Sequence, residues 1–175
     1  MIRYIKGDLL GHIPTNPKAV SILAHACNCH GSWGGGIANV IRRKFPSTYS
    51  PYSRHCQDLG CDPSKLLGTS IVIPSESTDS GNIKGLPPKY IACLFTSDFS
   101  ESSGEIVGYT EKAVKELLRQ LEELRSEVSL ESEPDGRLVV NMPKINAGIF
   151  NVPWEKTEAV LKKVEGVQFN VYVFE

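Results

Sequence analysis

The sequence has neither a long apolar segment nor an excess of charge of one sign. None of its runs approaches the roughly 18 consecutive apolar residues that a membrane-spanning helix needs. Lys and Arg total 19 against 20 Asp and Glu, which gives a net charge of −1. Nucleic acids and anionic membranes bind broad basic surfaces, so we expect neither as a direct partner. An anionic small molecule would instead be held by directed hydrogen bonds.

The chain has five cysteines, an odd number, and no apolar leader at its N-terminus. This combination predicts reduced thiols in the cytoplasm or the nucleus. A metal site built from Cys27, Cys29, His30, Cys56 and Cys61 is conceivable, but these spacings match no common zinc pattern. A chain of this length buries about 70% of its unfolded surface and needs no metal for a core. We therefore expect no metal and no cofactor.

The hydrophobic pattern predicts six strands with helices between them. The expected strands are 1–6, 19–26, 68–74, 90–96, 137–142 and 167–174. A long helix with Thr110 as its N-cap shows an apolar stripe at helical spacing, made of Val114, Leu117, Leu118, Leu121, Leu124 and Val128. A last helix begins at Pro153, whereas 75–89 and 97–108 are expected to be polar, exposed loops. This order indicates one three-layer α/β domain.

The segment from Asn28 to Gly36 is the most informative part of the chain. Three consecutive glycines precede a helix, so the backbone can approach a ligand closely, and the free N–H groups of the helix start attract an anion. The spacing is neither that of the GxxxxGK[ST] loop nor that of GxGxxG. A plain turn would need only one glycine, so three of them, with Trp33 just upstream, favour a ligand-binding loop over a structural turn.

A second loop of the same character covers residues 146–151. It follows the fifth strand and precedes the last helix, and ligands of open α/β sheets bind at the carboxyl ends of strands. Taken alone, this loop is as consistent with a connection as with a binding site. Together the two loops could hold a diphosphate, because each N–H bonded to a charged oxygen contributes roughly 1.5–3 kcal/mol.

These segments resemble one known family. Four motifs are similar to those of macro domains, namely Gly7-Asp8-Leu9, Ala26-Cys27-Asn28, Gly34-Gly35-Gly36 and Asn146-Ala147-Gly148-Ile149-Phe150. The similarity extends over nearly the whole chain and is greatest to the small fungal ADP-ribose 1″-phosphate phosphatases of that family. It implies a single macro domain over residues 1–175, with α/β/α layers around a mixed, mostly parallel six-stranded sheet.

The resemblance also implies how ADP-ribose would be bound. Asp8 would accept a hydrogen bond from the adenine amino group, or it is only a turn residue. Asn28 would bind the distal ribose, or it caps its own loop as an Asx turn. Tyr172 or Phe174 would lie on adenine, or belong to the core. The residues implied in substrate binding are Gly7, Asp8, Leu9, Ala26, Cys27, Asn28, Trp33, Gly34, Gly35, Gly36, Ile37, Ala38, Ile145, Asn146, Ala147, Gly148, Ile149, Phe150 and Asn151.

Among the four histidines, His25 is the candidate for catalysis. It ends a buried strand near the expected terminal phosphate, and a histidine can protonate a leaving sugar oxygen. The alternative is a buried histidine that supports Asn28, and the two interpretations stand about equal once the resemblance is included. His30 in the loop is a weaker candidate, and His12 and His55 are expected at the surface.

The sequence departs from other macro domain enzymes at four positions. Ser97 stands in place of a lysine and Phe150 in place of an aspartate, both of which serve one route of de-ADP-ribosylation in the family. Ala38 replaces an acidic residue of other macro hydrolases, and Trp33 stands where viral members often have a histidine. These departures argue against removal of ADP-ribose from proteins by the known routes.

The sequence therefore predicts a metal-independent phosphomonoesterase acting on ADP-ribose 1″-phosphate, with His25 and Asn28 as catalytic residues. The alternatives are a non-catalytic reader of ADP-ribose and a hydrolase of ADP-ribosyl esters on proteins. The expected partners are small ADP-ribose derivatives and, for the alternatives, ADP-ribosylated proteins, and we expect a monomer.

Overall fold

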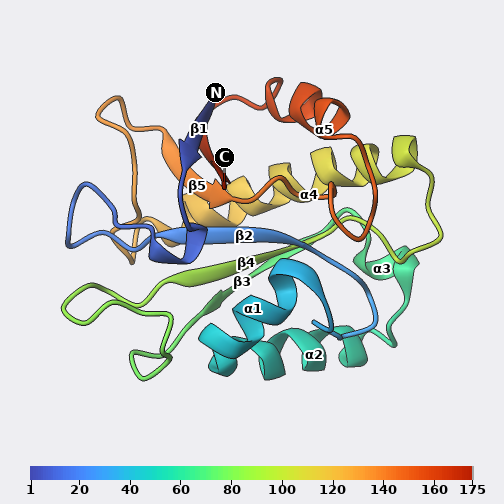
Figure 1. Cartoon of the computed structure of the whole chain (residues 1–175), viewed down its shortest axis with the longest axis horizontal. Coiled ribbons are helices and arrows are strands. Elements are labelled where there is room, and N and C mark those ends of the chain that lie inside the picture. The colour runs from blue at the N-terminus through green and yellow to red at the C-terminus, as the bar shows by residue number, and fades with distance from the viewer. Residues whose placement is uncertain (175) are drawn as a thin grey trace.

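The computed structural model describes residues 1–174 and contains one six-stranded sheet in the order β1-β6-β5-β2-β4-β3 (Figure 1). All neighbouring strands pair in parallel except β3, which runs antiparallel to β4. The strands are β1 Ile2–Lys6, β2 Ile22–Cys27, β3 Ser70–Pro74, β4 Tyr90–Phe95, β5 Leu138–Met142 and β6 Val167–Val173. The predicted three-layer architecture with a mixed, mostly parallel sheet is confirmed.

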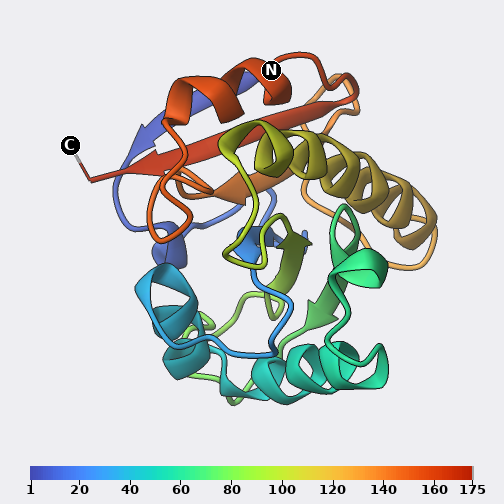
Figure 2. The same cartoon turned by 90° about the vertical axis from the view of Figure 1, so that its right-hand side faces the viewer.

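Helices cover both faces of this sheet, as Figure 2 shows. One face packs against α4 (Ser103–Leu124) and α5 (Trp154–Leu161), and the other against α1 (Gly36–Lys44), α2 (Tyr49–Asp58) and the short α3 (Pro63–Leu66). Successive strand residues point to opposite faces, so β2 contributes Ile22 and Ala24 to the first core and Leu23 to the second. Burial on both faces explains the continuous apolar runs of the central strands.

Helix α4 begins seven residues before Thr110, the N-cap predicted from the sequence. Ser102 is the true N-cap: its hydroxyl accepts a hydrogen bond from the Glu105 N–H, and the Glu105 carboxylate accepts one from the Ser102 N–H. This reciprocal capping box satisfies two N–H groups of the first turn. Thr110 is fully buried within the helix, where its hydroxyl donates to the Ile106 carbonyl. The predicted apolar stripe does face the core.

Two regions expected at the surface are partly buried. Within the loop 75–89, the side chains of Ser75, Asp79 and Lys89 are less than 9% exposed, and Lys89 Nζ donates to the Leu10 carbonyl at 3.0 Å. The loop is therefore pinned to the body of the domain by its polar groups. The polar groups of this loop bond to one another and to backbone. Composition alone cannot distinguish such internal bonds from exposure to solvent.

His12 is likewise buried, at 6% exposure, which contradicts its predicted surface position. Its Nε2 lies 2.9 Å from both carboxylate oxygens of Glu131, and its Nδ1 lies 2.6 Å from the Tyr172 hydroxyl. These bonds tie the segment after β1 to β6 and to the turn before β5. His55 is half-buried on α2, so it too is less exposed than predicted.

The sheet places the two glycine-containing loops next to each other. Strands β2 and β5 are neighbours and parallel, so their carboxyl ends lie at the same edge. After β2 the chain turns to α1 on one face, and after β5 it turns to α5 on the other. A crevice forms where connections diverge in this way, and it is the usual ligand site of open α/β sheets. Among residues 1–174, no helix is long and apolar enough to cross a membrane.

Candidate active site

A cavity of about 680 Å³ opens between the two loops at the ends of β2 and β5. Ligand pockets for small molecules and cofactors span about 300–1,000 Å³, so this one can accommodate a nucleotide-sized ligand. Its walls come from β2 and the glycine loop, from the loop after β5, and from one residue after β4. They are Ala26, Cys27, Asn28, His30, Ser32, Trp33, Gly34, Gly35, Gly36, Ile37, Ala38, Phe99, Pro143, Lys144, Ile145, Asn146, Gly148, Ile149 and Phe150.

The glycine loop presents unpaired backbone donors to this cavity. Gly35 is the N-cap of α1 and, having no side chain, supplies no cap of its own. Gly36 has φ +60°, a left-handed conformation that favours glycine. The N–H groups of Gly36, Ile37 and Ala38 belong to the first turn, where no earlier helical carbonyl can accept from them. This helix start is therefore an anion-binding surface built from backbone.

The two loops meet across the cavity. Ile149 Cδ1 lies 3.2 Å from the place where a Cβ atom on Gly35 would be, and 3.6 Å from the corresponding place on Gly36. The absent side chains of these glycines let the second loop approach the first. Both loops line one cavity, as their positions at the ends of neighbouring strands predicted.

Asn146 fixes the conformation of the second loop from below. Its Oδ1 accepts a 2.7 Å hydrogen bond from Thr96, and its Nδ2 donates to Thr110 at 2.9 Å. The side chain is buried and its backbone is left-handed, with φ +67°. Asn146 lines the cavity, but its amide is occupied by these internal bonds. The side-chain amide therefore has a structural role, and the predicted contact of Asn146 with the substrate stays a prediction.

Asn28 forms an Asx turn, which was one of the two roles predicted for it from the sequence. Its Oδ1 accepts from the His30 N–H at 2.9 Å and from the Tyr52 hydroxyl at 3.0 Å, while Nδ2 donates to the Ser32 carbonyl at 2.8 Å. A primary amide has two N–H donors, so one remains for a ligand. Because Asn28 is half-buried and lines the cavity, capping and binding are compatible.

Comparison with known proteins agrees with this geometry. A family model described as Macro domain matches residues 24–161. The chain belongs to the macro domain family. Three relatives, each named ADP-ribose 1″-phosphate phosphatase, are similar over nearly their whole length. They come from Scheffersomyces stipitis (65% identity over 99% of both chains), Debaryomyces hansenii (55% over 99% of both) and Saccharomyces cerevisiae (37% over 98% of this chain and 97% of the relative).

Solved macro domains share the fold at lower identity. The macrodomain of Thermus aquaticus DarG has a TM-score of 0.65 at 24% identity and covers 99% of this chain and 98% of its own. That of Mycobacterium tuberculosis DarG has 0.68 at 22%, covering 98% and 97%. Thermosipho africanus DarTG, solved in complex with ADP-ribose, has 0.67 at 14% over 99% of this chain and 42% of that one.

In this macro domain His25 does not reach the cavity. Its side chain is 0% exposed, lies under Trp33 with a ring separation of 4.9 Å, and is absent from the cavity wall. Its Nε2 and Nδ1 lie 3.5 and 3.7 Å from Cys27 Sγ. The prediction that His25 contacts the leaving oxygen therefore disagrees with the structure. His25 faces the helices α1 and α2, as alternate residues of β2 do, and supports the cavity floor.

Cys27 lies between His25 and the cavity and is itself 2% exposed. Burial raises the pKa of its thiol, but the neighbouring Cys93 thiol, the His25 ring and Trp33 outweigh this effect and lower the pKa to about 5. Burial and the neighbouring Cys27 raise the pKa of Cys93 instead. The pKa values of the two thiols are therefore shifted in opposite directions.

Some expected binding residues lie outside the cavity wall. They are Gly7, Asp8, Leu9, Ala147 and Asn151. Asp8 caps a short 3₁₀ helix, Leu9–Gly11, by accepting from the Leu10 N–H at 3.0 Å, so its predicted alternative as a turn residue is realised. Leu9 is buried. Asp8 still follows β1 at the same edge of the sheet as the cavity, because β1 runs parallel to the central strands.

The two aromatic candidates for adenine stacking differ in exposure. Tyr172 is half-buried, packs against the core on the α1 side and holds His12 through its hydroxyl. Phe174, at 87% exposure, belongs to no core. Tyr172 therefore has the structural role left open as an alternative, and Phe174 has neither a core position nor a place in the cavity wall.

The cavity has an aromatic rim that was not predicted from the sequence. Phe99 lies in the loop after β4 and has φ +75°, and its ring is 56% exposed. It stacks on His30 at 5.7 Å and meets Phe150 edge-on at 5.5 Å. His30 in turn has Nε2 3.1 Å from Asp98 Oδ1. The one available signal was a large aromatic residue within a polar loop after a central strand.

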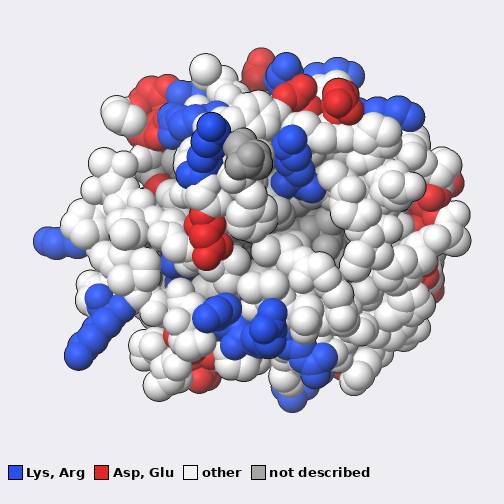
Figure 3. Space-filling view, viewed as in Figure 1, with Lys and Arg blue, Asp and Glu red and all other residues white. Residues whose placement is uncertain are grey.

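The electrostatics of the site come mainly from backbone. Lys144 is the only lysine or arginine of the cavity wall within the described chain. Figure 3 shows Lys and Arg in small groups among uncharged atoms, with Asp and Glu on the same face. No broad basic surface appears on that face, which agrees with ligand binding through directed amide donors.

Proposed function

We propose that this macro domain hydrolyses ADP-ribose 1″-phosphate to ADP-ribose and inorganic phosphate. The observation that supports it best is the cavity between two amide-rich turns in a chain that is 65% identical, over 99% of its length, to a protein named for that activity. The cavity suits an elongated, anionic nucleotide sugar, whose diphosphate would lie at the N-terminus of α1.

In this proposal the two loops hold the diphosphate from opposite sides. The free N–H groups of Gly36, Ile37 and Ala38 donate to one side, and the loop 148–150 covers the other. The remaining donor of Asn28 binds the distal ribose, and Phe150 packs on that sugar. Asp8 caps Leu10 through one carboxylate oxygen, and its other oxygen accepts from the adenine amino group.

The terminal phosphate would lie towards His30, the one histidine that lines the cavity among residues 1–174. Water attacks phosphorus, the bond from phosphorus to the 1″ oxygen breaks, and that oxygen leaves with a proton. His30 is half-exposed and its Nε2 lies 3.1 Å from Asp98 Oδ1, so in this proposal it donates the proton where the buried His25 cannot. The glycine-loop amides stabilise the extra negative charge of the transition state.

The test is phosphate release from ADP-ribose 1″-phosphate by the wild-type protein and by Asn28→Asp. The substitution replaces an N–H donor by a carboxylate oxygen near the phosphates, and losing a bond to a charged group costs about 1.5–3 kcal/mol, or roughly ten- to a hundredfold in kcat/KM. Asn16→Asp is the matched control, because Asn16 is exposed and outside this cavity.

Two outcomes would overturn the proposal. If the wild-type protein binds ADP-ribose in calorimetry but releases no phosphate, the domain is a reader. If it releases ADP-ribose from an automodified acceptor protein yet leaves the 1″-phosphate intact, its substrate is an ADP-ribosyl ester. Equal activity of Asn28→Asp and Asn16→Asp would remove Asn28 from the site.

A further inference from the structure

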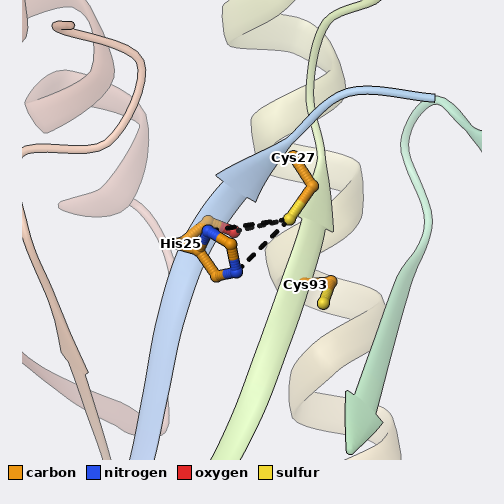
Figure 4. Close-up of side chains that lie close together, drawn as sticks. All are labelled: His25, Cys27 and Cys93. Atoms are coloured by element: carbon orange, nitrogen blue, oxygen red, sulfur yellow. Dashed lines mark hydrogen bonds between the residues drawn. The ribbon is translucent and has the colours of Figure 1, made fainter. Parts of the chain in front are cut away.

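Three side chains that can bind a metal meet beneath the cavity. His25, Cys27 and Cys93 are all buried, and one ligand atom from each lies within 4.8 Å of the other two. His25 and Cys27 are two residues apart on β2 and so point to the same face, while Cys93 is the residue of β4 aligned with His25. Figure 4 shows the three side chains close together, with dashed lines joining His25 to the Cys27 sulfur.

The ring nitrogens of His25 have only a sulfur atom as a hydrogen-bond partner within residues 1–174. Both ring nitrogens of His25 face the same Cys27 sulfur, at 3.5 and 3.7 Å, and neither has an oxygen partner among residues 1–174. The Cys27 thiol lies 3.8 Å from the His25 carbonyl oxygen, within the same strand. Buried polar groups are nearly always paired in folded proteins, so the cluster has unused binding capacity.

A disulfide does not account for the two cysteines. The parallel register aligns Cys93 with His25, so Cys27 lies diagonally, two residues farther along its strand. Strands about 4.8 Å apart that rise about 3.3 Å per residue put the two Cα atoms roughly 8 Å apart. A disulfide requires about 4.4–6.8 Å, so this pair would need backbone movement to form one.

We propose that His25, Cys27 and Cys93 bind a thiophilic divalent cation of the zinc class. Zinc–sulfur bonds of about 2.3 Å and zinc–nitrogen bonds of about 2.0–2.1 Å place tetrahedral ligand atoms roughly 3.5–3.8 Å apart. The His25 to Cys27 distance of 3.5 Å already fits, and Cys93 needs to close by about 1 Å at most. Two thiolates and a neutral imidazole give a complex without net charge, which suits an apolar surrounding.

This set differs from the cysteines considered in the sequence, because the fold brings Cys93 from a distant segment to the end of β2. Three protein ligands leave the fourth tetrahedral position to water or to another small ligand. Cys27 also lines the ADP-ribose cavity, so the cation would lie at its floor. The proposal concerns binding alone, and hydrolysis as described above proceeds without it.

The test is a titration of chelator-treated, reduced protein with Co²⁺, followed by Zn²⁺. We expect one equivalent of Co²⁺ to produce a thiolate-to-metal absorption band and the visible bands of tetrahedral cobalt, both removed by Zn²⁺. Cys93→Ser and His25→Gln should each weaken Co²⁺ binding at least tenfold. Cys61→Ser is the control, because Cys61 lies outside the cluster and is more exposed.

The proposal is overturned if the wild-type protein gives no thiolate band, or if the band survives unchanged in Cys93→Ser. Equal loss in Cys61→Ser would point to nonspecific thiol binding and would also overturn it. Circular dichroism and thermal unfolding establish that each variant is folded. Phosphate release by the metal-free protein is measured in parallel. Activity without a cobalt signal refutes only the metal site, and a cobalt signal without activity refutes only the proposed function.

Discussion

The Thr96 hydroxyl, at the end of β4, donates a 2.7 Å hydrogen bond to the Asn146 side chain in the loop after β5. This bond joins the ends of two strands that are not neighbours, since β2 lies between them. With Thr110 on α4 as a further partner, Asn146 fixes a loop that forms one wall of the cavity.

Asn146→Gly should therefore destabilise the protein although glycine tolerates its left-handed backbone. The change leaves the buried Thr96 hydroxyl without a partner, at a cost of about 1–3 kcal/mol. Asn151→Gly is the matched control, since Asn151 is also left-handed, with φ +56°, but exposed. We expect its effect to stay within about 0.5 kcal/mol. Urea unfolding measures both, and equal stabilities would contradict this role of Asn146.

Gly36→Ala should weaken both the fold and the binding of ADP-ribose. Its φ of +60° costs an alanine about 1–2 kcal/mol, and relief of that strain would rotate the amides at the start of α1. Gly108→Ala, inside α4 with open space around its Cβ position, should instead stabilise by about 0.5–1 kcal/mol. Unfolding and calorimetric titration test both variants, and unchanged ADP-ribose affinity in Gly36→Ala would argue against the amide site.

The two histidines near the cavity should respond differently to substitution. His30→Ala removes the proposed proton donor, so kcat for phosphate release should fall about 10²–10⁴-fold while ADP-ribose affinity is kept. The measurement is kcat for phosphate release by each variant, with ADP-ribose affinity from calorimetry.

His25→Ala opens a cavity under Trp33 and should reduce stability and raise KM, with a smaller loss of kcat than His30→Ala. The converse result, in which His25→Ala abolishes kcat and His30→Ala does not, would restore His25 as the acid. It would also mean that the cavity floor opens during turnover.

Lys89 should make the stability depend on alkaline pH. Burial lowers its pKa, more than the nearby Asp8 raises it. At a pH between the pKa of Lys89 in the folded protein and its usual value of 10.5, Lys89 is protonated in the unfolded chain but largely neutral in the folded one. The free energy of unfolding therefore rises with pH in that interval. The cost of burying the charged Lys89 side chain is fully present below its pKa in the folded protein, and it is relieved above that pKa.

The stability of the wild-type protein relative to Lys89→Met should therefore rise as the pH approaches 10.5, by up to about 1.4 kcal/mol for each unit of the shift. Lys18→Met, at an exposed position, is the control and should show no such trend. Urea unfolding at several pH values gives the comparison. A difference that is constant with pH would mean that Lys89 keeps its ordinary pKa in the folded state.

The sequence by itself determined the layers of this protein and the place of its cavity. The apolar run of β2 can be satisfied only by burial on both faces, and consecutive glycines before a helix leave backbone donors exposed. These are local properties, so they can be predicted from the sequence without knowledge of distant contacts. The Ser102 to Glu105 capping box was equally local and could have given the start of α4.

Only the tertiary structure decided which side chains reach the cavity. The sequence correctly predicted His25 near the end of β2. Its side chain points away from the cavity, because successive residues of the strand point to opposite faces and Trp33 packs over the ring. Asn146 was taken as a contact because its partners, Thr96 and Thr110, lie 50 and 36 residues away. Phe99 enters the rim through a left-handed backbone in a loop. Orientation depends on contacts between distant segments, and those exist only once the chain has folded.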